Sequence, residues 1–169
     1  PDSEYTAIIN KQINGEDNSA DNSSANFVFI KEKIDSLSQL KSLPELEGKF
    51  LYLDLWASWC MPCRGEFSYK EQVDTLLNTY KNIAIVYVSI DQEKQEKAWL
   101  NCIKRYKLDG FHLRASPELQ QDIQKLIYGT DTYDIPRYIL ISPTGKILHK
   151  NLSRPSNYPG LKKELDDIL

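Results

Sequence analysis

Two stretches of the chain are apolar almost without interruption. Residues 49–58, KFLYLDLWAS, are interrupted only by Asp54, and residues 83–91, IAIVYVSID, form a second such run. Continuous apolar runs of this length are typical of parallel strands that are covered on both faces of a sheet. We therefore expect two central strands, with Asp54 as a charged side chain inside the first.

Elsewhere the apolar residues recur at helical spacing. Four segments have this pattern, and each predicts a helix packed on the sheet through one apolar stripe. The stripes are Tyr69, Val73, Leu76, Leu77 and Tyr80; Trp99, Cys102, Ile103 and Tyr106; Leu119, Ile123, Leu126 and Ile127; and Leu161, Leu165, Ile168 and Leu169.

The remaining elements are shorter. Residues 27–30, FVFI, form a brief apolar run, and residues 36–49 predict a short helix or turn that ends at Gly48. Two apolar runs around residues 143–146, PTGK, predict a β-hairpin. The element order predicts an α/β fold: a mixed central sheet with parallel central strands, flanked by helices, with a C-terminal hairpin and helix.

Composition supports one domain with a polar extension. The chain has 169 residues, 41% apolar and 27% charged, and a net charge of −3 without a basic cluster, which disfavours nucleic acid as a partner. Residues 1–26 are polar and predict a flexible N-terminal segment or linker before a domain at 27–169. The chain begins at Pro1 without a leader, so we expect any targeting segment to lie upstream or to have been removed.

The most informative motif is WASWCMPCR, residues 56–64, which contains two of the three cysteines. A C-x-x-C pair on the first turn of a helix can form a disulfide, and the N–H groups and dipole there lower the pKa of the first thiol. Pro62 suits this turn because it lacks an N–H group. We expect Cys60 to be the nucleophile and Cys63 the resolving thiol, without a metal or other cofactor.

Two other interpretations of the pair stay open but are less favoured. A zinc site needs about four ligands, and Cys102, His112 and His149 lack paired ligand spacing. A purely structural disulfide would close too short a loop to restrict the unfolded chain much.

The stretches LDLWASWCMPCRGEF and YDIPRYILISPTGKIL together resemble the thioredoxin fold, specifically the TlpA/ResA-type thiol-disulfide oxidoreductases of Bacteroides-like bacteria. The resemblance covers roughly residues 27–169. It implies reduction of disulfides in partner proteins by a monomer in the periplasm or cell envelope. It also implies a thiol donor upstream that can be membrane-embedded, and a tether that precedes the sequence.

The resemblance also implies roles for individual residues. Ile135 and Pro136 match the cis-proline loop, which faces the dithiol and binds the substrate chain, and Trp59 is expected on the substrate-facing surface. Asp54 matches an acid that helps to deprotonate the resolving cysteine, and burial would raise its pKa. The lysine that accompanies this acid in thioredoxin is replaced here by Tyr87.

Two rival functions would use the same fold. A thioredoxin-fold binding module or copper-delivery protein would use the dithiol as a metal clasp, although copper-delivery relatives have a wider C-x-x-x-C spacing and a histidine. A peroxidase would need Cys102 as a separated partner, and Cys102 lies on an apolar stripe that predicts burial.

Overall fold

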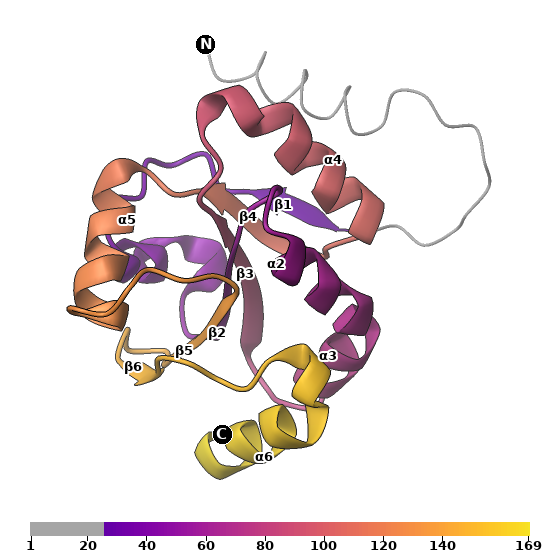
Figure 1. Ribbon diagram of the computed structural model, residues 1–169. Coiled ribbons are helices and arrows are strands. Elements are labelled where there is room, and N and C mark those ends of the chain that lie inside the picture. Colours follow the sequence, from indigo (N-terminus) through magenta and orange to yellow (C-terminus); the bar gives the residue numbers. More distant parts are fainter. Residues whose placement is uncertain (1–25) are drawn as a thin grey trace.

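A six-stranded mixed sheet crosses the molecule in the order β1-β4-β3-β2-β5-β6 (Figure 1). The first four strands in this order are parallel, and β5 and β6 are antiparallel to their neighbours. The strands are β1 Phe27–Phe29, β2 Phe50–Trp56, β3 Ile83–Ser89, β4 Gly110–Arg114, β5 Arg137–Ile141 and β6 Ile147–His149. This computed structural model describes residues 26–169, so the predicted flexible segment lies outside the described residues except for Asn26.

Helices cover both faces of this sheet. The α-helices are α2 Met61–Glu66, α3 Lys70–Leu77, α4 Glu96–Tyr106, α5 Pro117–Ile123 and α6 Tyr158–Ile168. Helix α5 and the two short 3₁₀ helices at Leu37–Ser42 and Pro44–Leu46 pack on one face, and the other helices on the opposite face (Figure 1). The predicted mixed sheet, flanking helices, C-terminal hairpin and closing helix are confirmed.

Strand β2 lies at the centre of the sheet, between β3 and β5. Its side chains alternate between the two faces, and six of its seven residues are buried. Leu51, Leu53 and Leu55 join the cluster under α5, whereas Tyr52 and Trp56 join clusters under α2, α3, α4 and α6. Asp54 shares the second face by the same alternation, which puts its carboxyl group on the side of the sheet that carries α2.

Strand β4 is absent from the sequence-based prediction. Its sequence, GFHLR, mixes apolar, charged and histidine residues, so neither alternation nor a continuous apolar run identifies it. The structure buries His112 in this strand, where its Nε2 lies 2.7 Å from the Leu108 carbonyl oxygen and its ring stacks on Tyr87. Burial lowers the pKa of His112 to about 4, so the ring is neutral at pH 7.

The single helix predicted after Pro62 is divided. A 3₁₀ turn at Phe67–Tyr69 separates α2 from α3. Because a 3₁₀ helix has three residues per turn, it shifts the phase of the apolar stripe, and Tyr69 is 37% exposed instead of buried. Within residues 26–169, no helix combines the length and apolar composition that crossing a membrane requires.

Candidate active site

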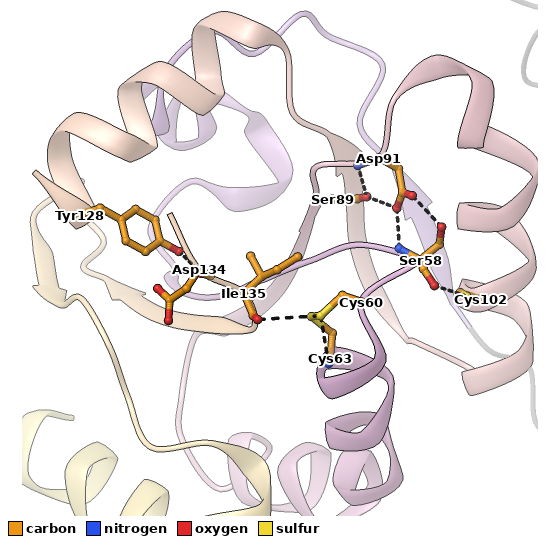
Figure 2. The surroundings of a disulfide bond; sticks show 9 residues. All are labelled: Ser58, Cys60, Cys63, Ser89, Asp91, Cys102, Tyr128, Asp134 and Ile135. Atoms are coloured by element: carbon orange, nitrogen blue, oxygen red, sulfur yellow. Dashed lines mark hydrogen bonds between the residues drawn. A yellow bond between two sulfur atoms is a disulfide. The ribbon is translucent and has the colours of Figure 1, made fainter. Parts of the chain in front are cut away.

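Cys60 and Cys63 form a disulfide at the start of α2 (Figure 2). Cys60 is the N-cap residue, Pro62 lies in the first turn, and the Cys63 N–H donates to Cys60 Sγ at 3.1 Å. The two Cα atoms are 5.3 Å apart. An N–H group directed at a sulfur stabilises negative charge there, so the local geometry favours Cys60 as the thiolate that attacks.

The Ile135–Pro136 loop faces the dithiol from the start of β5. The Ile135 carbonyl oxygen lies 3.9 Å from Cys60 Sγ (Figure 2). The Ile135–Pro136 peptide bond is cis. Trp59 is 54% exposed and Met61 77% exposed, although both cysteines are buried. The disulfide is therefore bordered by two large exposed apolar side chains and by a backbone carbonyl group.

Asp54 lies deeper, in the middle of β2, and is 4% exposed. Its Oδ1 has no hydrogen-bond partner among the described residues. Burial raises the pKa of Asp54 well above its usual value, and the nearby Glu66 raises it further. The prediction that Tyr87 occupies the neighbouring position on the next strand is confirmed. In the register of the sheet, Asp54 lies opposite Tyr87 of β3 and opposite Tyr138 of β5.

A small cavity borders Asp54. Its volume is about 20 Å³, enough for about one water molecule. The lining residues are Tyr52, Asp54, Glu66, Phe67, Lys70, Val73, Asp74, Ile85, Tyr87, Tyr138 and Pro155. Burial raises the pKa of Tyr52, Tyr87 and Tyr138, so their hydroxyl groups stay protonated beside the carboxyl group.

Glu66 is a carboxylate near Asp54 that the sequence analysis missed. It is 8% exposed, and its oxygens accept hydrogen bonds from the Ser156 N–H at 2.8 Å and Oγ at 2.9 Å. Its position three residues after Cys63 puts both on one face of α2, and this spacing could have identified it. The charged group that acts on Asp54 is thus a second carboxylate, whereas Lys70, which lines the same cavity, forms ion pairs with Asp74 and Asp109.

A second missed group supports the loop before Cys60. Asp91, which follows β3, accepts hydrogen bonds from the Ser58 N–H at 2.7 Å, Ser58 Oγ at 2.6 Å and Ser89 Oγ at 2.6 Å (Figure 2). The Ser58 carbonyl oxygen lies 3.9 Å from Cys102 Sγ, and Cys102 is half-buried rather than fully buried as its stripe predicts. Parallel β2 and β3 end at the same edge of the sheet, so Asp91 lies beside the loop that leads to Cys60. Its hydrogen bonds to Ser58 hold this loop in place.

Replacing Asp91 by alanine should lower the free energy of unfolding by about 3 kcal/mol or more, because three buried donors lose a charged acceptor. The matched control is Ser58→Ala, which removes one of these bonds and should cost about 1 kcal/mol. Urea denaturation of the oxidised protein measures both. Equal losses in the two variants would contradict the role given to Asp91.

Comparison with known proteins identifies the family. A family model described as thioredoxin-like matches residues 48–147, more than half of the chain. The chain belongs to the thioredoxin-like family. ResA from Bacillus subtilis, a thiol-disulfide oxidoreductase, is 29% identical over 150 residues, which cover 85% of this chain and 73% of ResA. The thioredoxin-like fold and the resemblance to the TlpA/ResA type are confirmed.

Solved structures of thiol-disulfide oxidoreductases are also similar to this chain. A candidate thiol-disulfide oxidoreductase from Bacteroides vulgatus is 37% identical with a TM-score of 0.52, covering 73% of this chain and 74% of that one. A thiol-disulfide oxidoreductase from Bacteroides fragilis is 26% identical with a TM-score of 0.59, covering 76% and 88%. The chain spans 57% of the length of ResA from Bacillus cereus, which it matches at 29% identity.

The structure brings together most of the site residues expected from the sequence. Cys60, Cys63 and Ile135 lie together (Figure 2). Trp59, which directly precedes Cys60, is exposed. Asp54 lies in the interior, on the face of the sheet that carries α2. Across residues 26–169, no three His, Cys, Asp or Glu side chains are arranged so that they could hold a metal ion.

Proposed function

We propose that this chain reduces disulfides in partner proteins through its C-x-x-C pair. The Cys60 thiolate attacks one sulfur of the substrate disulfide, the substrate S–S bond breaks, and its other sulfur leaves as a thiolate. Cys63 then attacks Cys60 Sγ in the mixed disulfide. The second substrate sulfur leaves, and Cys60 and Cys63 form a disulfide, so two electrons pass to the substrate.

One observation carries this proposal. Cys60 Sγ accepts the Cys63 N–H and lies 3.9 Å from the Ile135 carbonyl oxygen, beside the exposed Trp59. A substrate chain laid along Ile135 and Pro136 could use their backbone groups as in strand addition, with its disulfide next to Cys60. Trp59 would contact the same chain through its exposed ring.

Asp54 is proposed to accept the proton of Cys63 during resolution. Burial and the nearby Glu66 raise the pKa of Asp54 above that of an ordinary aspartate, so its carboxylate is a stronger proton acceptor than an exposed one. The carboxyl group and α2 share one face of the sheet, and Glu66 is positioned beside Asp54 from the same helix as Cys63. The redox pair itself supplies the electrons, so the reaction requires no other cofactor.

The remaining proposals rest on the resemblance to TlpA/ResA-type proteins. We infer that the substrates are proteins with accessible disulfides and that the chain acts as a monomer. A thiol donor upstream, embedded in the membrane, would return the pair to its reduced state. The corresponding location is the periplasm or the cell envelope.

The reduction potential of the Cys60–Cys63 pair tests the direction of the reaction. A reductant should have a potential of about −270 mV, as thioredoxin does, whereas an oxidant such as DsbA has a potential of about −120 mV. Equilibration with glutathione or dithiothreitol buffers, followed by alkylation of the thiols, measures it. The Cys102→Ala variant serves as the control because it removes the third thiol from the count. A value near that of DsbA would reverse the proposed direction.

A further inference from the structure

Tyr128 holds the loop that faces the dithiol. It ends a short π-helix, Gln124–Tyr128, and is 4% exposed. Its hydroxyl group donates a hydrogen bond of 2.5 Å to the carbonyl oxygen of Asp134, the residue before Ile135 (Figure 2). Single π-turns of this kind are frequent at functional sites. The bond ties the loop backbone, one residue from the carbonyl that contacts Cys60, to the end of a packed helix.

The Tyr128 ring itself contacts two further side chains. Tyr133 stacks on it with ring centroids 4.6 Å apart, and the Arg137 guanidinium group lies 4.6 Å from its centroid. Arg137 also forms an ion pair with the Asp134 carboxylate. Burial raises the pKa of Tyr128 to about 12, so the hydroxyl group remains a donor at neutral pH. The backbone and side chain of Asp134 are thus bound by two residues that also contact each other.

We propose that Tyr128 is a positioning residue for thiol-disulfide exchange. Its hydrogen bond directs the Asp134–Ile135 peptide group and thereby keeps the Ile135 carbonyl group against Cys60 Sγ. This inference deepens the proposed function and rests on it for its effect on substrates. The C=O and N–H groups of a trans peptide point in opposite directions. Anchoring the Asp134 carbonyl on Tyr128 therefore also directs the Ile135 N–H away from Tyr128.

Loss of the hydroxyl group should release this arrangement. Asp134 is exposed, so its carbonyl oxygen can turn to water once Tyr128 no longer binds it. The Ile135 carbonyl would then move away from Cys60. Because a carbonyl oxygen near a sulfur disfavours negative charge on that sulfur, its departure should stabilise the Cys60 thiolate. A substrate chain would also meet a less ordered backbone and bind more weakly.

Tyr128→Phe tests the proposal, with Tyr133→Phe as the matched control. Both variants lose one phenolic hydroxyl from the stacked pair, but the Tyr133 hydroxyl has no hydrogen-bond partner among the described residues. Two quantities are measured in a Cys102→Ala background. The first is the pH midpoint of Cys60 alkylation by iodoacetamide in the reduced protein, which mass spectrometry follows. The second is the pair of steady-state constants, KM and kcat, for a disulfide-containing peptide.

Tyr128→Phe should lower the alkylation midpoint and raise KM by about fivefold, which is the change that one hydrogen bond supports, with kcat little altered. Tyr133→Phe should match the parent in both measurements. If Tyr128→Phe matches Tyr133→Phe in midpoint and KM, the positioning role is wrong. The alkylation midpoint needs no substrate, so a shift there without any peptide reduction by the parent would uphold the positioning and refute the proposed function.

A second variant covers the case in which Tyr128→Phe does not fold. Arg137→Lys keeps the positive charge but loses the planar group that stacks on Tyr128. The alkylation midpoint of Arg137→Lys should also fall, by a smaller amount than that of Tyr128→Phe. An unchanged midpoint in a folded Arg137→Lys protein would then overturn the proposal.

Discussion

Replacement of Cys63 by alanine should turn the protein into a covalent trap for its substrates. Cys60 can still attack a substrate disulfide, but no second thiol is present to resolve the mixed disulfide. Turnover of a disulfide peptide should fall by about 10³-fold or more, as in other covalent catalysts that lose an essential group. Non-reducing electrophoresis and mass spectrometry detect the trapped adduct.

Two control variants make this result specific. Cys60→Ala removes the proposed nucleophile and should trap nothing, since Cys63 is 1% exposed. Cys102→Ala removes the third cysteine and should turn over peptide like the parent protein. Equal trapping by Cys60→Ala and Cys63→Ala, or trapping that depends on Cys102, would exclude the proposed order of attack.

Asp54→Asn should stabilise the protein at neutral pH and slow its reaction. Between the usual aspartate pKa of 3.8 and the raised pKa in the folded state, the folded protein binds more protons than the unfolded chain. Stability therefore falls as pH rises through this window. Asparagine stays neutral, so the variant should lose this pH dependence and have the larger free energy of unfolding at pH 7.

The same substitution removes the proposed proton acceptor for Cys63. The resolving step should slow by about 10²-fold, the usual contribution of a general base, while the first attack by Cys60 stays nearly unchanged. Rapid-quench kinetics with a disulfide peptide separate the two steps, and urea denaturation at several pH values measures stability. A variant that gains stability but resolves at the parent rate would show that Asp54 has no part in proton transfer.

Glu66→Gln provides the comparison for Asp54. Glu66 raises the pKa of Asp54 through like-charge repulsion, so its neutralisation should lower that pKa. The pH profile of the resolving step should then move to lower pH, while the base itself remains. An unmoved profile would mean that the two carboxyl groups do not influence each other during the reaction.

The two strands nearest the dithiol could be predicted because strands that are buried on both faces must be apolar. A central strand must be apolar on both faces, and both KFLYLDLWAS and IAIVYVSID satisfy that condition. The same pattern made Asp54 conspicuous as the charged residue in the first run. The C-x-x-C spacing was equally informative, because two cysteines three positions apart at a helix start can pair without any other part of the fold.

Contacts between distant segments could not be predicted in this way. Strand β4 was missed because its pairing with β1 and β3, rather than its own pattern, makes GFHLR a strand. Asp91 reaches Ser58 across 33 positions, and Glu66 reaches Ser156 across 90. These hydrogen bonds depend on which strand ends and helix ends the fold brings together, a property of the whole chain.

The sequence by itself predicted the C-x-x-C pair, the two central strands and the buried acid in the first of them. These features are encoded by local spacing and by the requirement that apolar segments be buried. Only the tertiary structure decided what surrounds the pair: the Ile135 carbonyl against Cys60, Tyr128 behind that loop, and Glu66 beside Asp54. Those neighbours come from separate elements, and packing alone sets their distances.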